Sequence, residues 1–323
     1  MRILIETTGL HKEMPSAEVL AVGGGIPIEE RGKLFVVDVT QWEPLKRLGY
    51  SARIMEFLGK SAFNELPFAP QHVVEGRYAI RALNAGFKGN TEALRESLYE
   101  LVWSSLSAPQ VDLKNPQTVL YAYMTPKEVW WGRLLHEFGA DAFAQRDSKH
   151  RVFKRAVEMQ PRKARCLVNL SRVQPGERML DPFCGTGSFL IEAASMGVQA
   201  YGGDVDGEMV SGAKRNAAHL GLAADVRHID GRLTSGWGVK FDAIVTDLPY
   251  GRSASLKKVK MAELYKDFLE SAWGVLGPDK YAVVLAPKGK LKVPPKLFAK
   301  VSAFDEYVHG SLTRQIFVLH KKD

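Results

Sequence analysis

Residues 181–194 read DPFCGTGSFLIEAA, and this stretch decides the fold of the C-terminal half of the chain. The apolar residues 179–180 precede it and residues 188–196 follow helical spacing, so the turn between a strand and a helix is predicted here. Gly185 and Gly187 let the backbone of this turn pass close to a ligand, and the helix that follows offers free N–H groups at its start. The stretch therefore predicts a ligand-binding turn of an α/β fold.

The same order of strand, turn and helix repeats through the rest of the C-terminal half. Such alternation is typical of a doubly wound parallel sheet. Two further apolar runs are separated by HGSLTR, residues 309–314, which predicts a terminal antiparallel hairpin. The expected strands are 179–180, 200–202, 226–229, 243–246, 281–286, 303–308 and 315–319, and the expected helices are 188–196, 208–220 and 261–276.

The first 160 residues mix strands and helices over short distances, which favours small α+β modules over one parallel sheet. Asn90 precedes one helical pattern and is a typical cap residue. Residues 136–155 carry mixed charges without an apolar period, as is typical of a linker. Strands are expected at 3–6, 34–39, 78–83, 118–124 and 129–135, and helices at 16–22 and 91–105.

The composition is that of an ordinary folded protein. The chain has 323 residues, 46% hydrophobic and 25% charged, so two or three domains are expected and a disordered or fibrous chain is excluded. Cys166 and Cys184 are the two cysteines, without metal-ligand spacing, which favours a reducing compartment and predicts no metal site. The N-terminus reads as a strand and the apolar runs are too short for a membrane, so a cytoplasmic protein is expected.

Three classes of cofactor use a glycine turn of this kind. A phosphate-binding P-loop requires GxxxxGK[ST], which the turn lacks. A nicotinamide fingerprint requires a third glycine where this chain has Leu190, and Asp181 before the turn would repel a pyrophosphate. The turn is therefore better suited to a cationic ligand.

S-adenosylmethionine fits this turn because it carries a sulfonium and an ammonium but no phosphate. Asp181 ends the first strand and can accept from the ammonium, Asp204 ends the second and can accept from the ribose, and Asp230 can accept from the adenine amine. A single Asp at a strand end is more often a turn or cap residue, but three on one sheet edge favour a ligand site. The expected cofactor-binding residues are Asp181, Pro182, Phe183, Cys184, Gly185, Thr186, Gly187, Asp204, Val205, Asp230 and Gly231.

A second motif, TDLPYG at residues 246–251, ends the fourth strand. A nucleobase amine is a poor nucleophile, and the Asp247 carboxylate and the Leu248 carbonyl can both accept its N–H bonds as it attacks a methyl group. Tyr250 can stack on a base that has turned out of its helix. DLPYG alone would read as a turn, but it lies 66 residues after Asp181 at a strand end, which favours chemistry. The expected catalytic residues are Asp247, Leu248, Pro249 and Tyr250.

The positions of the two cysteines indicate whether a carbon or a nitrogen atom receives the methyl group. Carbon methylation of a pyrimidine requires a cysteine nucleophile beside the ring. No cysteine lies in or near TDLPYG, and Cys184 inside the glycine turn is expected to pack as a small residue. The sequence therefore favours methylation of an amine nitrogen.

These motifs resemble those of RNA and DNA amino-methyltransferases, whose pattern is DPFCGTG followed by [DN]PP[YF]. Within this large group, the chain resembles most specifically the archaeal THUMP-domain tRNA guanosine-10 N2-methyltransferases. The segments that carry this resemblance are residues 164–194, 202–216 and 243–255. That resemblance implies transfer of methyl from S-adenosylmethionine to N2 of guanosine 10 in tRNA, once or twice. The family usually has a second Pro where this chain has Leu248, and Pro would fix the loop more rigidly.

In the N-terminal half, RYAIRALNAG at 77–86, the helix at 91–105 and VDLKNPQTVLYAY at 111–123 resemble a THUMP domain, which in this family binds the tRNA acceptor 3′ end. Some relatives also depend on a small zinc-binding activator protein. The implied domains are a ferredoxin-like module at 1–60, a THUMP domain at 61–138, a linker at 139–160 and a Rossmann-type methyltransferase domain at 161–323.

The positive charge is concentrated in the C-terminal half. Residues 1–160 hold 20 basic and 19 acidic side chains and residues 161–323 hold 24 and 17, which accounts for most of the net +8. Nine cations follow the fourth and fifth strands, where the loops share the predicted site's edge, so phosphate contacts with RNA are expected. They are Arg252, Lys257, Lys258, Lys260, Lys288, Lys290, Lys292, Lys296 and Lys300, and the THUMP-like segment adds Arg77, Arg81 and Lys88.

The residues alone leave the substrate open, because DLPYG contacts only the reacting amine. Guanosine 6 of tRNA, a ribosomal RNA amine and adenine in DNA remain alternatives. A non-catalytic RNA-binding relative would keep the same fold.

Overall fold

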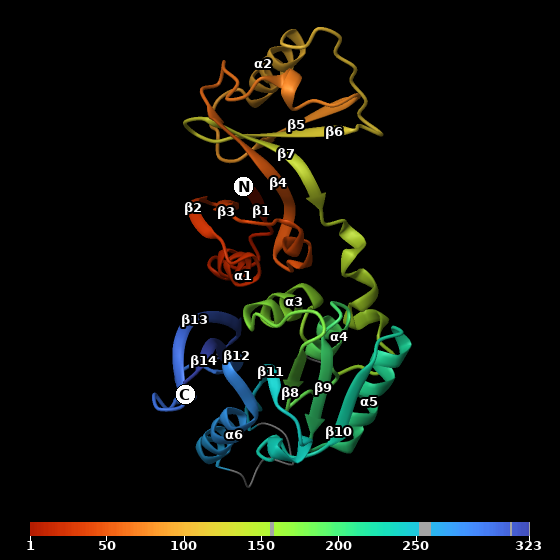
Figure 1. The fold of residues 1–323 in the computed structure, drawn as a ribbon, viewed down its shortest axis with the longest axis vertical. Helices are drawn as coiled ribbons and strands as arrows, with labels where there is room; N and C mark the ends of the chain where they lie inside the picture. The colour runs from red at the N-terminus through yellow and green to blue at the C-terminus, as the bar shows by residue number, and fades with distance from the viewer. Residues whose placement is uncertain (156–157, 252–259, 311, 323) are drawn as a thin grey trace. The chain divides into compact units, whose positions relative to one another are not determined.

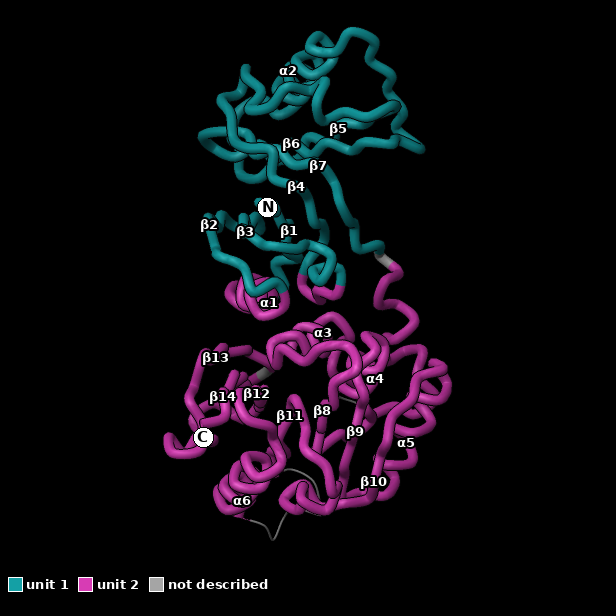
Figure 2. The backbone as a smooth tube through the Cα atoms, in the orientation of Figure 1, with its two compact units in different colours: residues 1–10, 23–46, 51–139 teal, residues 11–22, 47–50, 140–323 magenta. Residues whose placement is uncertain are grey.

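The structure is a computed structural model that describes residues 1–155, 158–251, 260–310 and 312–322. It divides into two compact units, shown in Figure 2. The first unit holds residues 1–10, 23–46 and 51–139, and the second holds 11–22, 47–50 and 140–323.

The second unit contains a seven-stranded sheet in the order β10-β9-β8-β11-β12-β14-β13 (Figure 1). The strands from β10 to β12 pair in parallel, and β14 is antiparallel to both β12 and β13. This topology confirms the predicted parallel sheet and terminal hairpin. The strands are β8 (Arg178–Asp181), β9 (Gln199–Asp204), β10 (Ala224–His228), β11 (Phe241–Asp247), β12 (Leu276–Pro287), β13 (Phe298–His309) and β14 (Leu312–Lys321).

Helices cover both faces of this sheet. Met179 of β8 shares a core cluster with Leu167 of α3 and Phe189 of α4. Its neighbour Leu180 shares the opposite cluster with Leu264 of α6. Burial on both faces explains why these strands read as apolar runs without alternation. The helices are α3 (Pro161–Leu170), which the sequence analysis did not predict, α4 (Ser188–Ala194), α5 (Gly207–His219) and α6 (Met261–Val275).

A segment near the N-terminus, most of α1 (Met14–Gly23), also belongs to the second unit. Glu18 of this helix is fully buried and accepts hydrogen bonds from the backbone N–H groups of Gly49 and Tyr50 at 2.7 and 3.0 Å. It also accepts one at 2.6 Å from the side-chain amide of Asn169 on α3, 151 residues further along the chain. The units are therefore not continuous stretches of sequence, unlike the domains expected above.

The first unit is built on a seven-stranded sheet in the order β2-β3-β1-β4-β7-β6-β5. β5 and β6 pair in parallel, and the other neighbours are antiparallel. The sheet continues past residue 60, where a module boundary is expected, because β4 pairs with β7. The strands are β1 (Arg2–Thr7), β2 (Ile26–Arg31), β3 (Leu34–Asp38), β4 (Ser51–Ser61), β5 (Tyr78–Asn84), β6 (Thr118–Met124) and β7 (Val129–Glu137), of which β2 and β4 were not predicted.

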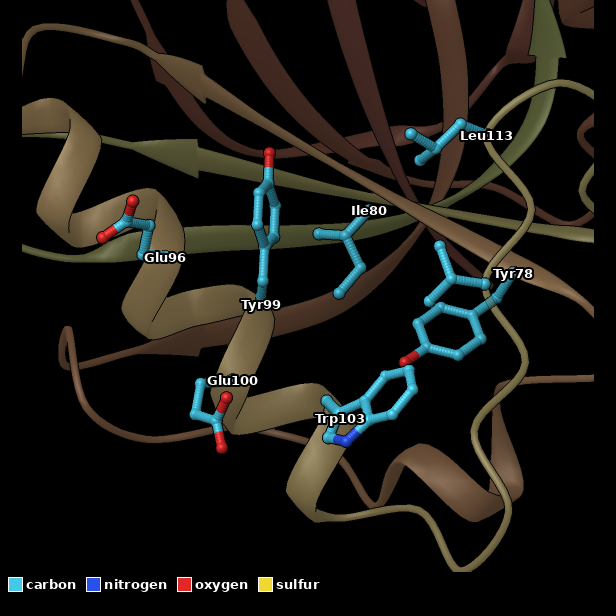
Figure 3. A pocket seen from close by; sticks show the side chains of 8 residues that line it. Tyr78, Ile80, Glu96, Tyr99, Glu100, Trp103 and Leu113 are labelled. Atoms are coloured by element: carbon cyan, nitrogen blue, oxygen red, sulfur yellow. The ribbon is translucent and has the colours of Figure 1, made fainter.

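The helix α2 (Thr91–Ser104) packs on this sheet and begins at the predicted cap, because the Asn90 side chain accepts from the N–H groups of Glu92 and Ala93. A groove of about 500 Å³ lies beside the helix (Figure 3). Two glutamates line it, which makes it unsuited to phosphate. Its lining is Tyr78, Ile80, Glu96, Tyr99, Glu100, Trp103, Val111 and Leu113.

Short 3-10 turns complete the described elements. They are Glu43–Arg47, Pro70–His72, Ala140–Ala142, Ala144–Arg146, Ser148–His150 and Thr234–Trp237. Within the described ranges, every helix is too short or too polar to cross a membrane.

Candidate active site

Three of the predicted aspartates end adjacent strands of the second unit's sheet. Asp204, Asp181 and Asp247 are the last residues of β9, β8 and β11, which are neighbours in that order. Asp230 lies two residues beyond β10, the next strand along. The parallel strands, which lie side by side in Figure 1, thus bring the residues expected to hold a cofactor and the one expected to act on a base to one edge of the sheet.

Asp181 is the most deeply buried of these acids, with 2% of the residue exposed. Its Oδ1 accepts hydrogen bonds from the Thr246 hydroxyl at 2.7 Å and from the N–H of Phe183 at 3.2 Å. Burial raises the pKa of Asp181 to about 8, and the negative charges of Asp204 and Asp247 act in the same direction. A cationic group bound beside Asp181 would favour its ionised form.

The glycine turn is held by the neighbouring strand end. Asp204 Oδ2 accepts from the N–H of Gly185 at 2.9 Å, and its Oδ1 accepts from the N–H of Asp206. Gly187 has a φ of +88°, and a Cβ there would lie 3.2 Å from the Cβ of Ala213 on α5. The turn therefore depends on glycine both for its backbone angle and for its closeness to the next helix.

Cys184 lies inside this turn, where its side chain is buried and burial raises the pKa of the thiol well above its usual range. A Cβ on Gly202 would lie 3.2 Å from the Cys184 sulfur, so the thiol fills the space that this glycine leaves. The thiol therefore packs as a small apolar group.

Asp230 is engaged by a residue that the sequence analysis did not consider. Arg232 binds both carboxylate oxygens, with its shortest contact at 2.6 Å, and this hydrogen bonding lowers the pKa of Asp230. An adenine amine would therefore share Asp230 with Arg232. A Cβ on Gly231 would lie 2.7 Å from the carbonyl oxygen of Pro182, so the turns after β10 and β8 adjoin. Val205 is half exposed in the turn after β9, the strand between them.

The loop after β11 is fixed at two points. The N–H of Leu248 donates to the carbonyl of Leu285 on β12 at 2.9 Å, and the Leu248 side chain is buried against α6. The Tyr265 hydroxyl donates to the carbonyl of Pro249 at 2.8 Å. A proline at 248 has no N–H and could not make the first of these bonds. Leu248 therefore restores by hydrogen bonding and burial the rigidity that the missing proline would have supplied.

Asp247 is paired on both carboxylate oxygens. The Tyr250 hydroxyl donates to Oδ1 at 2.5 Å, and the Arg314 guanidinium lies 3.4 Å from Oδ2. Arg314 also donates from Nε to the Tyr250 hydroxyl at 2.6 Å. Burial raises the pKa of Asp247, and the charge of Arg314 opposes that shift. Arg314 was not among the expected site residues.

Two further residues missed by the sequence analysis hold the glycine turn. Arg151 is buried and donates to the Ser188 hydroxyl at 2.8 Å and to Thr186 Oγ1 at 3.4 Å. Asn216 of α5 donates to the carbonyl oxygens of Thr186 and Phe153 and accepts from the N–H of Phe153. The segment expected to be a linker thus supports the predicted cofactor turn. A polar Asn among the apolar positions of a helix was the available signal.

Six of the nine cations expected to contact RNA in the second unit lie in the described ranges, and four of these six are exposed after β12 or at the start of α6. Lys288 and Lys290 directly follow β12 and are exposed at the carboxyl edge, where Lys288 pairs with Asp305 at 2.6 Å. Lys260 is exposed at the start of α6 and pairs with Glu263. Lys292 is also exposed, further from the strand end. Arg252, Lys257 and Lys258 lie outside the described residues.

The expectation that Lys296 and Lys300 share the same edge is wrong. The chain after β12 returns along the sheet before β13 begins, so β13 starts at the opposite, amino edge. Lys300 pairs in register with Leu319, which in turn faces Ala282, at the amino end of the part of β12 that pairs with β14. The order of these lysines after a strand does not show where the chain turns back along the sheet, so their edge could not be predicted from the sequence.

The three cations expected in the first unit are exposed around β5. Arg77 precedes this strand and pairs with Asp112 at 2.9 Å, and Arg81 lies on it. Lys88 follows in the turn before α2. They lie on one strand and the turns that flank it, and their contact with RNA stays a prediction.

Comparison with known proteins gives consistent results. Residues 148–293 match the UPF0020 family, described as the RMKL-like methyltransferase domain. Over 99% of the chain, and all of the relative, the sequence is 33% identical to a Methanothermobacter thermautotrophicus protein named tRNA (guanine(10)-N2)-dimethyltransferase. A Pyrococcus abyssi protein of the same name is 31% identical over 98% of the chain and 99% of its own length. The fold is similar to that of TrmN from Thermus thermophilus, with a TM-score of 0.55 and 23% identity over the whole of both chains.

Proposed function

Because this chain belongs to the tRNA (guanine(10)-N2)-dimethyltransferase family, we propose that its carboxyl-edge site transfers methyl from S-adenosylmethionine to N2 of guanosine 10 in tRNA. It is an S-adenosylmethionine-dependent tRNA (guanine-N2)-methyltransferase. The observation that carries the proposal is the position of Asp247, at the end of β11 before a fixed loop, on the sheet edge that also holds Asp181 and Asp204.

The chemistry of the strand-end residues fits this cofactor. Asp181 is a buried acid for the ammonium, and Asp204 lies at the next strand end with oxygens that accept hydrogen bonds, as ribose hydroxyls require. When bound, S-adenosylmethionine supplies a methyl group on a positively charged sulfur. We propose that the remaining residues of the adjoining turns, Pro182, Phe183, Cys184, Gly185, Thr186, Gly187, Val205, Asp230 and Gly231, complete its site.

Asp247 has the central role in this proposal. Its carboxylate accepts a hydrogen bond from the guanine N2 amine and takes the proton released when nitrogen forms its bond to the methyl carbon. The Leu248 carbonyl accepts the second N–H, and it is held between two anchored groups, the N–H of Leu248 and the carbonyl of Pro249. These acceptors draw the amine lone pair out of conjugation, and their rigidity lowers the cost of aligning it.

Tyr250 tests the stacking part of this arrangement. Removing the ring by Tyr250→Ala is expected to lower kcat/KM for tRNA by about 5- to 150-fold, because stacking of a base on an aromatic ring contributes about 1–3 kcal/mol. Tyr250→Phe keeps the ring and loses only the hydroxyl that contacts Asp247, so it should stay within about fivefold of the original protein. Steady-state kinetics at saturating S-adenosylmethionine give both values. Equal losses in the two variants would contradict stacking.

The exposed lysines at the carboxyl edge are proposed to contact tRNA phosphates. Changing Lys288 and Lys290 together to Gln should weaken tRNA binding and reduce the slope of log K against log salt by about one unit per lysine. The matched control is the same change at Lys296 and Lys300, which lie away from this edge. Filter binding over a salt series separates the pairs. An equal effect of both would argue against a localised tRNA surface.

The substrate and product are decided by one experiment. The protein is incubated with labelled S-adenosylmethionine and unmodified tRNA, and the modified nucleotide is mapped by nuclease digestion and mass spectrometry. The proposal expects N2-methylguanosine at position 10, followed by N2,N2-dimethylguanosine if the pocket readmits the first product. Methylation at guanosine 6 or in another nucleic acid would replace this substrate, and no transfer would support a non-catalytic RNA-binding protein.

The N-terminal half and the partners are proposed on the same basis. We propose that residues 61–138 act as a THUMP domain on the acceptor 3′ end through Arg77, Arg81 and Lys88, and that a ferredoxin-like module at 1–60 shares its sheet through the pairing of β4 with β7. Residues 161–323 would form most of the methyltransferase domain, and the expected linker at 139–160 would add Arg151, which holds its glycine turn. A small zinc-binding activator protein is also proposed, and adding one to the methylation assay tests whether it raises the rate.

A further inference from the structure

A chain of four alternating charges begins at the carboxylate of Asp247. Arg314 of β14 lies opposite Glu306 of β13 in the hairpin register, with 4.0 Å between the guanidinium and that carboxylate. Glu306 also forms an ion pair with Lys163 of α3. The order is therefore Asp247, Arg314, Glu306 and Lys163, and the side chain of Arg314 is only 12% exposed. Because little water reaches Arg314, the attraction between neighbouring charges in this chain is weakened less than it would be at an exposed surface.

Arg314 uses three different nitrogens for three partners. Its Nε donates to the Tyr250 hydroxyl, its Nη2 faces Asp247 and its Nη1 faces Glu306. The guanidinium is planar and rigid, so fixing it in the hairpin also fixes the relative positions of the carboxylate and the tyrosine. A lysine would keep the charge and lose this three-way geometry.

The other groups around Asp247 make this charge necessary. Asp181 from β8 and Glu306 from β13 are acidic residues, whereas Arg314 from β14 and Lys163 from α3 are basic ones. The hydroxyls facing it are those of Tyr250 in its own loop and Tyr265 from α6. Among the residues that the structure describes, loss of Arg314 would leave Lys163 as the cation that offsets the two acids beside buried Asp247, so the neutral form of Asp247 would be favoured.

Resting on the function proposed above, we propose that Arg314 is a positioning residue that keeps Asp247 ionised and holds Tyr250 against it until guanine binds. The guanine amine replaces the Tyr250 hydroxyl as the donor to Asp247, and Arg314 retains the displaced phenol by its Nε. Glu306 sets the strength of this effect, because it shares the Arg314 charge. The site thus includes one residue from each strand of the terminal hairpin, Glu306 from β13 and Arg314 from β14.

The test uses two variants that shift the pH dependence in opposite directions. Transfer requires ionised Asp247, so the rate falls as pH falls through its pKa, and burial already raises that pKa. Arg314→Gln removes the opposing charge and should move the acid limb of the single-turnover rate to higher pH by about one unit, a roughly tenfold loss on that limb. Glu306→Gln should move the limb to lower pH. Arg314→Lys should restore the limb while recovering only part of the maximal rate.

The matched control is Lys280→Gln. Lys280 pairs with Glu177 at 2.6 Å and Asp242 at 3.1 Å at the amino end of the same sheet, so its loss removes a comparable partly buried charge far from Asp247. Its pH profile should match that of the original protein. The proposal would be overturned if Arg314→Gln lowered the transfer rate by the same factor at every pH. It would also be overturned if Arg314→Gln and Glu306→Gln moved the acid limb in the same direction.

Failure of the proposed function would be recognised separately, because the original protein would then transfer no methyl to tRNA in the same assay. The ionisation of Asp247 is in that case followed by ¹³C NMR of the aspartate carboxyls in the tRNA-free protein. The midpoint of Asp247 should be higher in Arg314→Gln and lower in Glu306→Gln than in the original protein. If Arg314→Gln does not fold, Glu306→Gln and Arg314→Lys still decide the outcome, and unmoved midpoints would overturn the role of Arg314.

Discussion

Asp247→Ala is expected to lower the rate of methyl transfer to tRNA by at least about 10³-fold, because loss of one positioned hydrogen-bonding group in a transition state typically costs about 10²–10³ and the proton acceptor is lost with it. The substitution leaves Leu248 anchored to Leu285 and Pro249 to Tyr265, so the loop should keep its shape. Binding of S-adenosylmethionine should stay within about threefold, since Asp181 and Asp204 are untouched. Single-turnover transfer and calorimetric titration measure the two effects.

Asp247→Asn is the matched control for this prediction. Its amide oxygen can still accept from the guanine amine but cannot take the proton, so its rate should lie between those of Asp247→Ala and the original protein. Full activity of Asp247→Ala would contradict the assignment of Asp247 as the catalytic proton acceptor.

Asp181→Asn is expected to make the protein more stable and its cofactor binding weaker. Burial raises the pKa of Asp181 to about 8, so the folded state binds this proton more tightly than the unfolded chain does. The stability that the group contributes is present at low pH and is lost as pH rises from about 4 towards 8. Asn resembles the protonated acid and avoids this loss, so the free energy of unfolding at pH 7.5 should rise by at least about 1 kcal/mol.

The same substitution removes the charge that attracts the cofactor ammonium, so the affinity for S-adenosylmethionine should fall by at least about tenfold. The introduced amide oxygen can still accept from the Thr246 hydroxyl, which keeps the hydrogen bond that holds the strand end. The stability gain should disappear near pH 4, where the acid is largely protonated in both states. Denaturant unfolding at the two pH values and calorimetric titration of the cofactor provide the measurements. A variant that is less stable at pH 7.5 and binds the cofactor normally would contradict both parts.

Much of the cofactor edge could be predicted from the sequence because its signals are local. The run around Gly185 and Gly187 predicted a strand, a turn and a helix, and Asp181, Asp204 and Asp247 are each the last residue of a strand. In a parallel sheet, a residue at a strand end lies at a known edge whatever the order of the strands. This is why three separate segments could be placed together without a structure.

The residues that support those aspartates could not be predicted in the same way. Arg314 faces Asp247 because β14 pairs with β12, and nothing local to residue 314 specifies that partner. Arg151 lies in a stretch without an apolar period, and its role depends on contacts with Ser188 across the fold. Lys300 was misplaced for the same reason, since the course of the returning segment depends on tertiary packing.

The buried pairing of Glu18 with Asn169 constrains how the chain can fold during its synthesis. Glu18 leaves the ribosome 151 residues before its partner, which at about 5–20 residues per second is a delay on the order of ten seconds. Throughout that time α1 lacks the α3 surface against which it is buried. The nascent chain therefore exposes the apolar face of α1, and Glu18 lacks its Asn169 partner, while the first sheet is being made. The second unit can close only after translation of its own C-terminal strands, which makes a single cut between the two units an unsuitable way to produce either one alone.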